Sequence, residues 1–522
     1  MAVFGKNILE NLTTGMYSDS RVIYREYVQN SCDAIDAAVS AGIIERKDTS
    51  IDIIIDDIKQ EIRIRDNGCG ISKEDFVRVL SDIANSDKKR AVDKGFRGIG
   101  RLCGLAYCKE LQFISTAAGE ATASIMTWNA WKMRTMLNDD RKHTALEVLE
   151  EIMATTEQPV GASEHFFEVI MTGVTNQDLL NKDIIRDYLS FEIPVPYPSR
   201  FMFYGFIYEH AKSLGITIDE YNVYVNVEQV FKGYKDKIYS NAGGKPHDEI
   251  KDVKFYDFYD ENEKLIAWMW FGLSSFNGQI KSQGNLQRGL RLRKGNIQIG
   301  HSGTLRTLFK DHRGNEYFIG EIFAVHPDLI PNARRDYFNE NVIRDVFETQ
   351  LRKYFEYLWK LCNVASDERS AYRAIEDYRN SITSYKEKAK SGFSGGIDKE
   401  TMRTVLEEKR RKAEKGQKTL QKSKEIHDDE ITARVKSIVQ TVESAQVREP
   451  FKPLPEIPSD GEKPEGGKKP KSVYITDELS QYPKETRRVV GKIYDLINLN
   501  APSIAQDLIA KIHAGLKAAK KD

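Results

Sequence analysis

Two glycine-rich turns near the start of the chain constrain its fold more than any other feature. The first turn, Asp66-Asn67-Gly68-Cys69-Gly70, follows a short strand pattern, and the second, Gly95-Phe96-Arg97-Gly98-Ile99-Gly100-Arg101, precedes an apolar helix pattern. Glycines let a backbone approach a flat ligand closely. Backbone amides at the start of a helix suit phosphate oxygens. Together the two turns predict a ligand that carries a flat ring and phosphates.

The first long helix pattern adds polar groups that could act on such a ligand. Glu26, Asn30 and Asp33 are spaced i, i+4 and i+7 and therefore share one helix face. A carboxylate can orient and deprotonate water, and an asparagine carbonyl can bind magnesium without adding charge beside phosphates. Asp66, at the end of its strand, can accept a hydrogen bond from an exocyclic amine such as that of adenine. Each cluster alone also fits a solvated helix face or a plain Asp-Asn-Gly turn.

The arrangement of helix and strand patterns predicts an α/β sandwich for about residues 4–174. We expect a helix from Leu9 to Val39, and strands at Ser50–Ile55, Glu61–Arg65, Leu111–Ser115 and Phe166–Met171. The glycine pattern does not indicate a dinucleotide-binding fold, because it does not follow a strand in a βαβ unit and no acidic residue follows at the required spacing.

In this order the three clusters resemble the ATP site of the GHKL superfamily, the Bergerat-fold ATPases that include gyrase, heat-shock chaperones of the HtpG type, histidine kinases and MutL. The resemblance covers about Leu9 to Val174 and is closest to the chaperones. Met16–Asp19 followed by Tyr24–Asn30 resembles their first helix pair, and Ile83–Lys89 resembles the start of their ATP lid. Gly95–Gly98 also resembles MutL.

The resemblance implies a role for each residue. Glu26 would be the general base for the attacking water, Asn30 the Mg²⁺ ligand, and Asp33 a residue lining the pocket beside it. Asp66 would bind the adenine amino group, within a turn whose Gly68 and Gly70 belong to the ATP site. The other ATP-binding residues would be Ser86 and Lys88 near the lid hinge, and Gly95, Arg97, Gly98, Ile99, Gly100 and Arg101 in the phosphate loop. The family's threonine near adenine is missing from Gly161–Val169, where Ser163 or His165 could replace it.

Beyond residues 1–185, the proline-rich segment Ile193–Pro198 predicts a boundary before an α/β middle, transducer-like domain at 195–345. Its segment Leu329–Asp336 resembles the catalytic loop of the chaperones' middle domain. Arg335 matches the arginine that reaches the terminal phosphate, and Arg334 stands where the family has serine. A planar, always-charged guanidinium can stabilise developing phosphoryl charge. We expect Arg288–Lys294 to be a solvated edge strand rather than a nucleic-acid groove.

The remaining chain is predicted to be an extended helical part. Residues 346–446 are rich in Lys, Glu and Arg and fit long exposed helices, compatible with a coiled coil, joined at Ser391–Gly396. Residues 447–473 fit a disordered linker, and 474–522 a small helical domain that docks or dimerises. Arg403–Lys424 holds nine Lys or Arg against three Glu. A solvated helix is the ordinary interpretation of this segment, and a contact with phosphate backbones is the alternative.

The whole chain of 522 residues has 78 basic and 78 acidic residues, so no overall charge favours nucleic acid or membrane. Its five cysteines form no CxxC pair, which favours reduced thiols. No signal peptide or long apolar run is visible, so we expect a cytoplasmic protein without a membrane partner.

These observations predict a slow, Mg²⁺-dependent ATPase that acts as an ATP-gated dimeric clamp with a protein client or partner, like the chaperones. One alternative is a DNA-associated clamp resembling MORC or MutL proteins, for which prokaryotic genome defence is one setting. Another is an ATP-binding scaffold with negligible hydrolysis.

Overall fold

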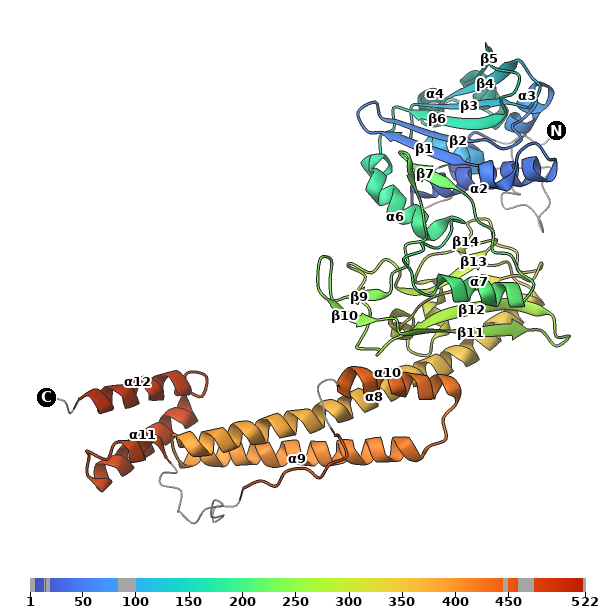
Figure 1. The fold of residues 1–522 in the computed structure, drawn as a ribbon. Helices are drawn as coiled ribbons and strands as arrows, with labels where there is room; N and C mark the ends of the chain where they lie inside the picture. Colours follow the sequence, from blue (N-terminus) through green and yellow to red (C-terminus); the bar gives the residue numbers. More distant parts are fainter. Residues whose placement is uncertain are drawn as a thin grey trace. The chain divides into compact units, whose positions relative to one another are not determined.

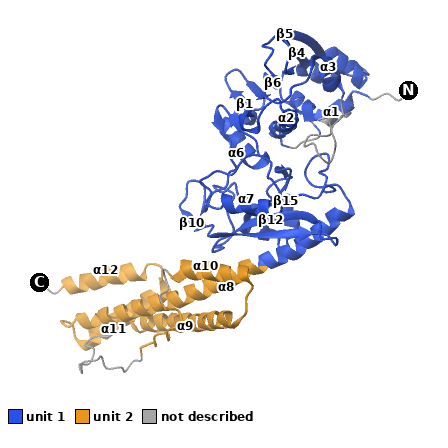
Figure 2. Cartoon of the chain, turned by 45° about the vertical axis from the view of Figure 1, so that its right-hand side comes forward, with its two compact units in different colours: residues 1–359 blue, residues 360–522 orange. Residues whose placement is uncertain are grey.

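A computed structural model describes residues 5–13, 15, 19–82, 100–444, 449–458 and 474–519. The chain divides into two compact units, residues 1–359 and residues 360–522 (Figure 2). The first unit contains the sheets and the second is built of long helices (Figure 1). The predicted α/β class with an extended helical C-terminal part is therefore confirmed. Among the described residues, no helix is both long and apolar enough to span a membrane.

The first sheet has eight strands in the order β5-β4-β3-β6-β2-β1-β7-β8. Its strands are β1 Ile51–Asp56, β2 Glu61–Asp66, β3 Glu110–Thr116, β4 Thr122–Asn129, β5 Met153–Pro159, β6 Phe166–Thr172, β7 Val223–Val225 and β8 Glu228–Gln229. Neighbouring strands are antiparallel, except that β7 runs parallel to β1. The sheet is thus completed by two strands that follow the proline-rich segment.

Helices pack against this sheet because side chains along its strands alternate between buried and exposed positions. In β1, Ile51, Ile53 and Ile55 are buried while Asp52 and Ile54 are exposed. The helices of this region are α1 Asn7–Thr13, α2 Val22–Ser40, α3 Lys73–Ser81, α4 Ala130–Leu137, α5 Ala145–Ile152, α6 Lys182–Glu192 and the short 3₁₀ helix η2 Gly100–Ala106.

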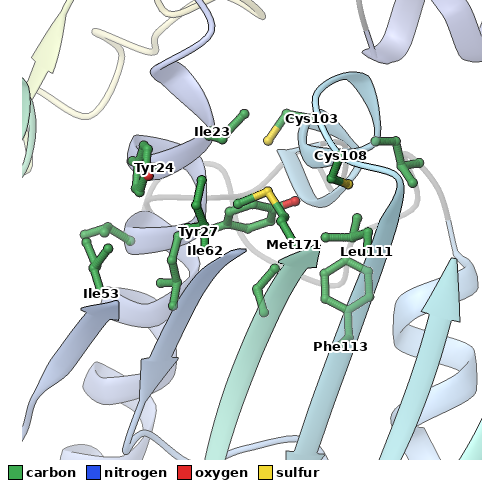
Figure 3. Close-up of a cluster of buried hydrophobic side chains, with 14 of the residues drawn as sticks. Ile23, Tyr24, Tyr27, Ile53, Ile62, Cys103, Cys108, Leu111, Phe113 and Met171 are labelled. Carbon is green, nitrogen blue, oxygen red and sulfur yellow. The ribbon is translucent and has the colours of Figure 1, made fainter. Parts of the chain in front are cut away.

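The core of this domain lies between α2 and the strands. Tyr24 and Tyr27 of α2 are buried with Ile62, Phe113 and Met171 of the sheet (Figure 3). The expected single helix from Leu9 to Val39 is wrong, since α1 ends at Thr13 and α2 begins only at Val22. The apolar period continues across both helices and therefore does not reveal the break.

A second sheet, ordered β11-β12-β15-β13-β14, forms the middle region. Its strands are β11 Asp252–Tyr259, β12 Leu265–Leu273, β13 Gly289–Lys294, β14 Ile297–Ile299 and β15 Ile319–Ala324, and a separate ribbon pairs β9 Lys237–Tyr239 with β10 Pro246–Glu249. Helix α7, Tyr204–Ser213, buries Ile207 against Trp268 and Trp270. The start of α8, Val342–Ser391, also packs on this sheet, where Tyr354 stacks on Tyr256 with ring centroids 3.8 Å apart.

The interpretation of Arg288–Lys294 as a solvated edge strand is wrong. Strand β13 is an interior strand between β15 and β14, and the side chains of Arg291 and Arg293 are buried. Arg293 is neutralised inside the sheet by Glu321 of β15. Alternating basic residues can therefore mark a buried ionic network as well as a solvated edge.

The second unit consists of the rest of α8 with α9 Gly396–Glu425, α10 Glu430–Ser444, α11 Lys484–Asn500 and α12 Ala505–Ala518. Helix α8 ends at Ser391 and α9 begins at Gly396, so the predicted joint in the charged helices is confirmed. Gly392 has φ of 96°, a left-handed conformation that favours glycine at this turn. Ala413 and Leu420 of α9 are buried on one side of the helix.

Candidate nucleotide site

Helix α2 brings the first predicted cluster to the edge of the core. Its apolar side packs on the sheet, and Glu26, Asn30 and Asp33 follow one another at helical spacing on another side. Glu26 is buried, with 8% of its surface exposed, whereas Asn30 and Asp33 are half-buried. A nearly buried carboxylate beside two accessible polar groups can act on a ligand that covers this end of the helix.

The end of the second glycine turn lies directly against Glu26. A Cβ atom added to Gly100 would be 2.8 Å from Glu26 Oε2, so a larger residue would displace that carboxylate. The following 3₁₀ helix is held to α2 by Tyr27, whose hydroxyl donates to the Arg101 carbonyl at 3.0 Å and accepts from the Gly104 amide at 3.2 Å. The structure thus joins two motifs that are distant in sequence.

Arg101 does not direct its side chain freely to solvent. Its guanidinium donates to the carbonyls of Val79 and Asp82 at the end of α3. The expected ATP-binding residues Ser86, Lys88, Gly95, Arg97, Gly98 and Ile99 lie outside the described residues.

The first glycine turn is fixed by its own backbone contacts. Asp66 is 1% exposed at the end of β2, and its Oδ1 accepts from the Gly68 amide at 3.0 Å. A Cβ atom on Gly68 would lie 2.7 Å from the carbonyl carbon of Ala34 in α2. Gly70 has φ of 64°, and a Cβ atom there would lie 2.0 Å from the Thr116 carbonyl oxygen. Both glycines are therefore required by the packing of this turn, whatever ligand it contacts.

Of the two residues considered as replacements for the family's threonine, only His165 contacts this turn among the described residues. Its Nδ1 lies 2.8 Å from the Gly68 carbonyl oxygen, while Ser163 is exposed. His165 is thus in position to orient the turn that carries Asp66.

The loop that carries Arg335 reaches the same helix. With the Gln29 amide oriented so that its oxygen faces the guanidinium, that oxygen accepts from Arg335 Nη1 at 2.7 Å and from Nη2 at 2.8 Å. Gln29 directly precedes Asn30 and is 1% exposed. The first unit therefore places the middle-region arginine against the helix that carries Glu26 and Asn30.

The conformation of the Arg335 loop is itself constrained. The Asn332 amide donates to the Tyr337 carbonyl at 2.9 Å, and the Gly300 amide donates to the Arg335 carbonyl at 2.7 Å. Arg335 has φ of 56°, a left-handed conformation that costs a non-glycine residue roughly 1–2 kcal/mol. Such strained residues are concentrated at functional sites, where surrounding contacts maintain them.

A buried polar chain links Glu26 to the second sheet. Arg25 Nη2 donates to Glu26 Oε1 at 3.1 Å, and Arg25 Nη1 lies 3.8 Å from Glu192 Oε2 at the end of α6. Glu192 in turn accepts from Gln298 of β14, which accepts from Arg291 of β13 at 2.6 Å. Burial would lower the pKa of Arg25, but the carboxylates of Glu26 and Glu192 raise it, so that Arg25 remains charged.

Burial also raises the pKa of Glu192, against the effect of Arg25, Arg291 and Arg293. Sequence reasoning missed Gln29, Arg25 and Glu192. Gln29 gave one signal, since it lies three residues after Glu26 and so falls near the same helix face. Arg25 and Glu192 gave none, because the pair that they form joins residues far apart in sequence.

A bound magnesium ion fits this residue set. Among the described residues, no group of three or more His, Cys, Asp or Glu could hold a metal by itself. Magnesium in phosphate-binding sites commonly keeps water ligands and uses one or two protein oxygens together with phosphates. The half-buried Asn30 next to Glu26 supplies one such oxygen.

Part of the chain, which includes α2 and the first glycine turn, matches a known family. Residues 17–157 match the family described as "Histidine kinase-, DNA gyrase B-, and HSP90-like ATPase". This part of the chain is therefore a GHKL-type ATP-binding domain, as the ordered motifs predicted.

Relatives of this domain include chaperones of the HtpG type. The chain is 25% identical over 145 residues to chaperone protein HtpG of Streptomyces coelicolor, covering 24% of this chain and 23% of that protein. It is 28% identical over 126 residues to HtpG of Orientia tsutsugamushi, covering 21% and 20%. It is 30% identical over 95 residues to the endoplasmin homolog of Arabidopsis thaliana, covering 17% and 12%. The matches thus span less than a quarter of the length of these relatives, and the similarity concerns the ATP-binding domain alone.

Proposed function

We propose that this protein hydrolyses ATP slowly and acts as an ATP-gated clamp of chaperone-like type. The observation that carries the proposal is the contact between Arg335 and Gln29, beside Asn30 and within one helical turn of Glu26. A charged group from the middle region and a carboxylate from the ATP-binding domain are the two protein groups that hydrolysis of a terminal phosphate needs.

In this mechanism Asp66 would select adenine through its amino group, and the Gly100 end of the phosphate loop would keep the terminal phosphate close to Glu26. Glu26 would orient the attacking water and accept its proton. Asn30 would hold magnesium, and the ion would supply neutralisation of the phosphate charge. Arg335, held beside α2 by Gln29, would stabilise the charge that develops on the phosphoryl oxygens. Turnover would be slow because these groups meet fully only after the domains close.

Three substitutions and the removal of magnesium test the proposed site. Glu26→Ala should abolish hydrolysis while calorimetry still shows ATP binding, and Arg335→Ala should lower kcat by roughly 10²–10³-fold. Asp66→Asn should weaken ATP binding, and removal of magnesium with EDTA should stop turnover. Equal hydrolysis by the parent and Glu26→Ala would refute the assignment of the base. Binding without hydrolysis by the parent would instead favour the scaffold alternative.

The clamp also requires two protomers, and α11 supports this part of the proposal. Val489, Ile493, Leu496 and Leu499 are exposed along this helix, at spacings that keep most of them on one side. A second copy of the helix would cover such a stripe. Light scattering after gel filtration should show a dimer for the parent and a monomer for Ile493→Glu/Leu496→Glu. A monomeric parent would remove dimerisation through this helix from the proposal.

A second candidate function, a DNA-associated clamp, is favoured by one observation, the excess of basic residues at Arg403–Lys424 of α9. It is distinguished from the chaperone-like clamp by the ATPase rate measured with and without duplex DNA at two salt concentrations. Salt-dependent stimulation favours the DNA-associated clamp, and an unchanged rate favours a clamp that acts on a protein client.

A further inference from the structure

Helix α9 carries a concentrated positive charge within a chain of zero net charge. Four basic residues, Arg411, Lys415, Lys418 and Lys422, follow one another at i, i+4, i+7 and i+11. All four are exposed, and this spacing keeps them on one side of a helix. We call this set the basic face of α9.

The basic face points away from the packed side of α9. Leu406, Ala413 and Leu420 are buried on the packed side, together with Gly416, whose added Cβ would lie 2.9 Å from the Ala371 carbonyl oxygen of α8. At 100° per residue, the basic face lies about opposite these residues. Figure 1 shows α8 running beside α9 on one side of it. The cations are therefore presented by a helix whose position is fixed by its other face.

The acids nearest this face pair elsewhere: Glu407, four residues before Arg411, pairs with Arg403, and Glu414, four residues before Lys418, pairs with Arg410. Adjacent basic residues do form ion pairs, since Lys409 bonds Asp377 at 3.0 Å and Arg410 bonds Glu414 at 3.0 Å. Within the described part of the chain, Arg411, Lys415, Lys418 and Lys422 form no ion pair.

The composition of the face selects among anionic partners. A helix that binds a membrane surface also inserts apolar residues, yet the large apolar residue exposed on α9 among the described residues, Val405, lies off the basic face. Single-stranded nucleic acids are bound through aromatic stacking platforms, and the basic face has no aromatic residue. A rigid line of cations without apolar or aromatic groups fits a regularly spaced, rigid line of phosphates.

We propose that the basic face of α9 binds the phosphodiester backbone of a double-stranded nucleic acid without reading its sequence. At a rise of 1.5 Å per residue, the four cations extend over about 16 Å. A DNA duplex presents roughly ten phosphates along that length, enough for each cation to find a partner. This goes beyond ATP hydrolysis and gives the second candidate function its contact surface.

The test is direct binding of the full-length protein, without nucleotide, to a fluorescein-labelled 30-base-pair duplex of mixed sequence, followed by anisotropy from 50 to 300 mM NaCl. Each phosphate contact contributes about −0.9 to the slope of log Kobs against log salt, so four contacts give about −3.6. Lys418→Gln/Lys422→Gln should flatten the slope by about 1.8 and weaken binding at 100 mM salt by roughly 50-fold. An RNA duplex of the same sequence, measured in parallel, identifies which duplex is preferred.

The matched control is Lys386→Gln/Lys390→Gln, which removes two exposed lysines at the same i, i+4 spacing from α8 of the same unit. It should keep the parent slope. No binding at 50 mM salt, or equal losses in both double variants, would overturn the proposal. So would stronger binding to phosphatidylserine vesicles or to polyglutamate than to either duplex. Because ATP is absent, these outcomes leave the ATPase proposal to the Glu26→Ala test.

Discussion

Two groups of charged side chains, one in each unit of the chain, contrast in how they are paired and exposed. In residues 1–359, the side chains of Lys232, Arg293 and Glu321 are completely enclosed by the protein. In residues 360–522, drawn in orange in Figure 2, Arg410 and Glu414 form a half-exposed pair, and the four cations of the basic face of α9 are exposed. A buried charge requires partners at fixed positions, because its desolvation costs several kcal/mol. An exposed charge remains solvated until a partner arrives.

The buried cluster fixes the geometry of the region that holds the Arg335 loop. Lys232 Nζ lies 2.8 Å from both Glu321 Oε1 and Asn296 Oδ1, and Glu321 also accepts from Arg293 and Tyr197. Arg293 donates further to the Phe191 carbonyl at 2.8 Å, next to Glu192 at the end of α6. The cluster therefore connects the second sheet to the polar chain that ends at Glu26.

The sharpest test of the contrast removes one carboxylate from each unit. Glu321→Gln leaves Lys232 and Arg293 buried without their counter-charge, and we expect it to lower the free energy of unfolding by about 3–5 kcal/mol. Glu414→Gln breaks a half-exposed pair and should change that free energy by less than about 1 kcal/mol. Urea denaturation followed by tryptophan fluorescence and far-UV circular dichroism measures both. Similar small losses in the two variants would show that burial does not distinguish the units.

Local patterns predicted the elements of this fold better than its long-range contacts. Strands β1, β2, β3 and β6 fall where alternation predicted them, and the helices meet at Ser391–Gly396 as composition indicated. The break between α1 and α2 and the interior position of β13 were missed. In both cases the residue pattern of the sequence is compatible with the predicted and with the observed structure, and only tertiary packing decides between the two.

The candidate site shows the same division. The spacing of Glu26, Asn30 and Asp33 was visible because it depends on one helix, and the match to residues 17–157 agrees with the order of the motifs. The contact of Gln29 with Arg335 was not visible, since it joins two regions that the sequence keeps far apart. The roles of these five residues in ATP hydrolysis remain predictions.

A smaller effect is expected where a buried contact positions a group without carrying chemistry. Gln29→Leu removes the oxygen that holds Arg335 beside α2, so we expect kcat to fall about tenfold, equivalent to 1.4 kcal/mol, with KM nearly unchanged. Gln29→Glu retains an acceptor and should keep most of the activity. Steady-state ATPase kinetics measure both variants.

A double-mutant cycle separates positioning from general damage to the fold. In the Arg335→Ala background, Gln29→Leu should have little further effect, because the group that it positions is already absent. Independent, multiplicative losses in kcat would show that Gln29 does not act through Arg335. A matched loss of thermal stability in Gln29→Leu would point to packing of α2 instead.

The smallest predicted effect concerns pH and tests whether enclosure governs the charge of Lys232. Burial, with the neighbouring Arg293, lowers the pKa of Lys232 to about 7, against the opposing effect of Glu321. Between pH 7 and 8 the unfolded chain keeps this proton and the folded chain loses it. The free energy of unfolding should therefore rise by about 1 kcal/mol between pH 7 and pH 8.

Lys232→Met should remove this rise, whereas Lys310→Met, at an exposed position of the same unit, should retain it. Urea denaturation at pH 7.0, 7.5 and 8.0, followed by tryptophan fluorescence, gives the slope for each protein. A parent whose stability is flat in this range would mean that Glu321 keeps Lys232 charged despite burial. The buried lysine of the first unit would then stay protonated in this pH range, like the exposed lysines of the second unit. The two groups of charges would differ in burial and in the positions of their partners, but not in protonation.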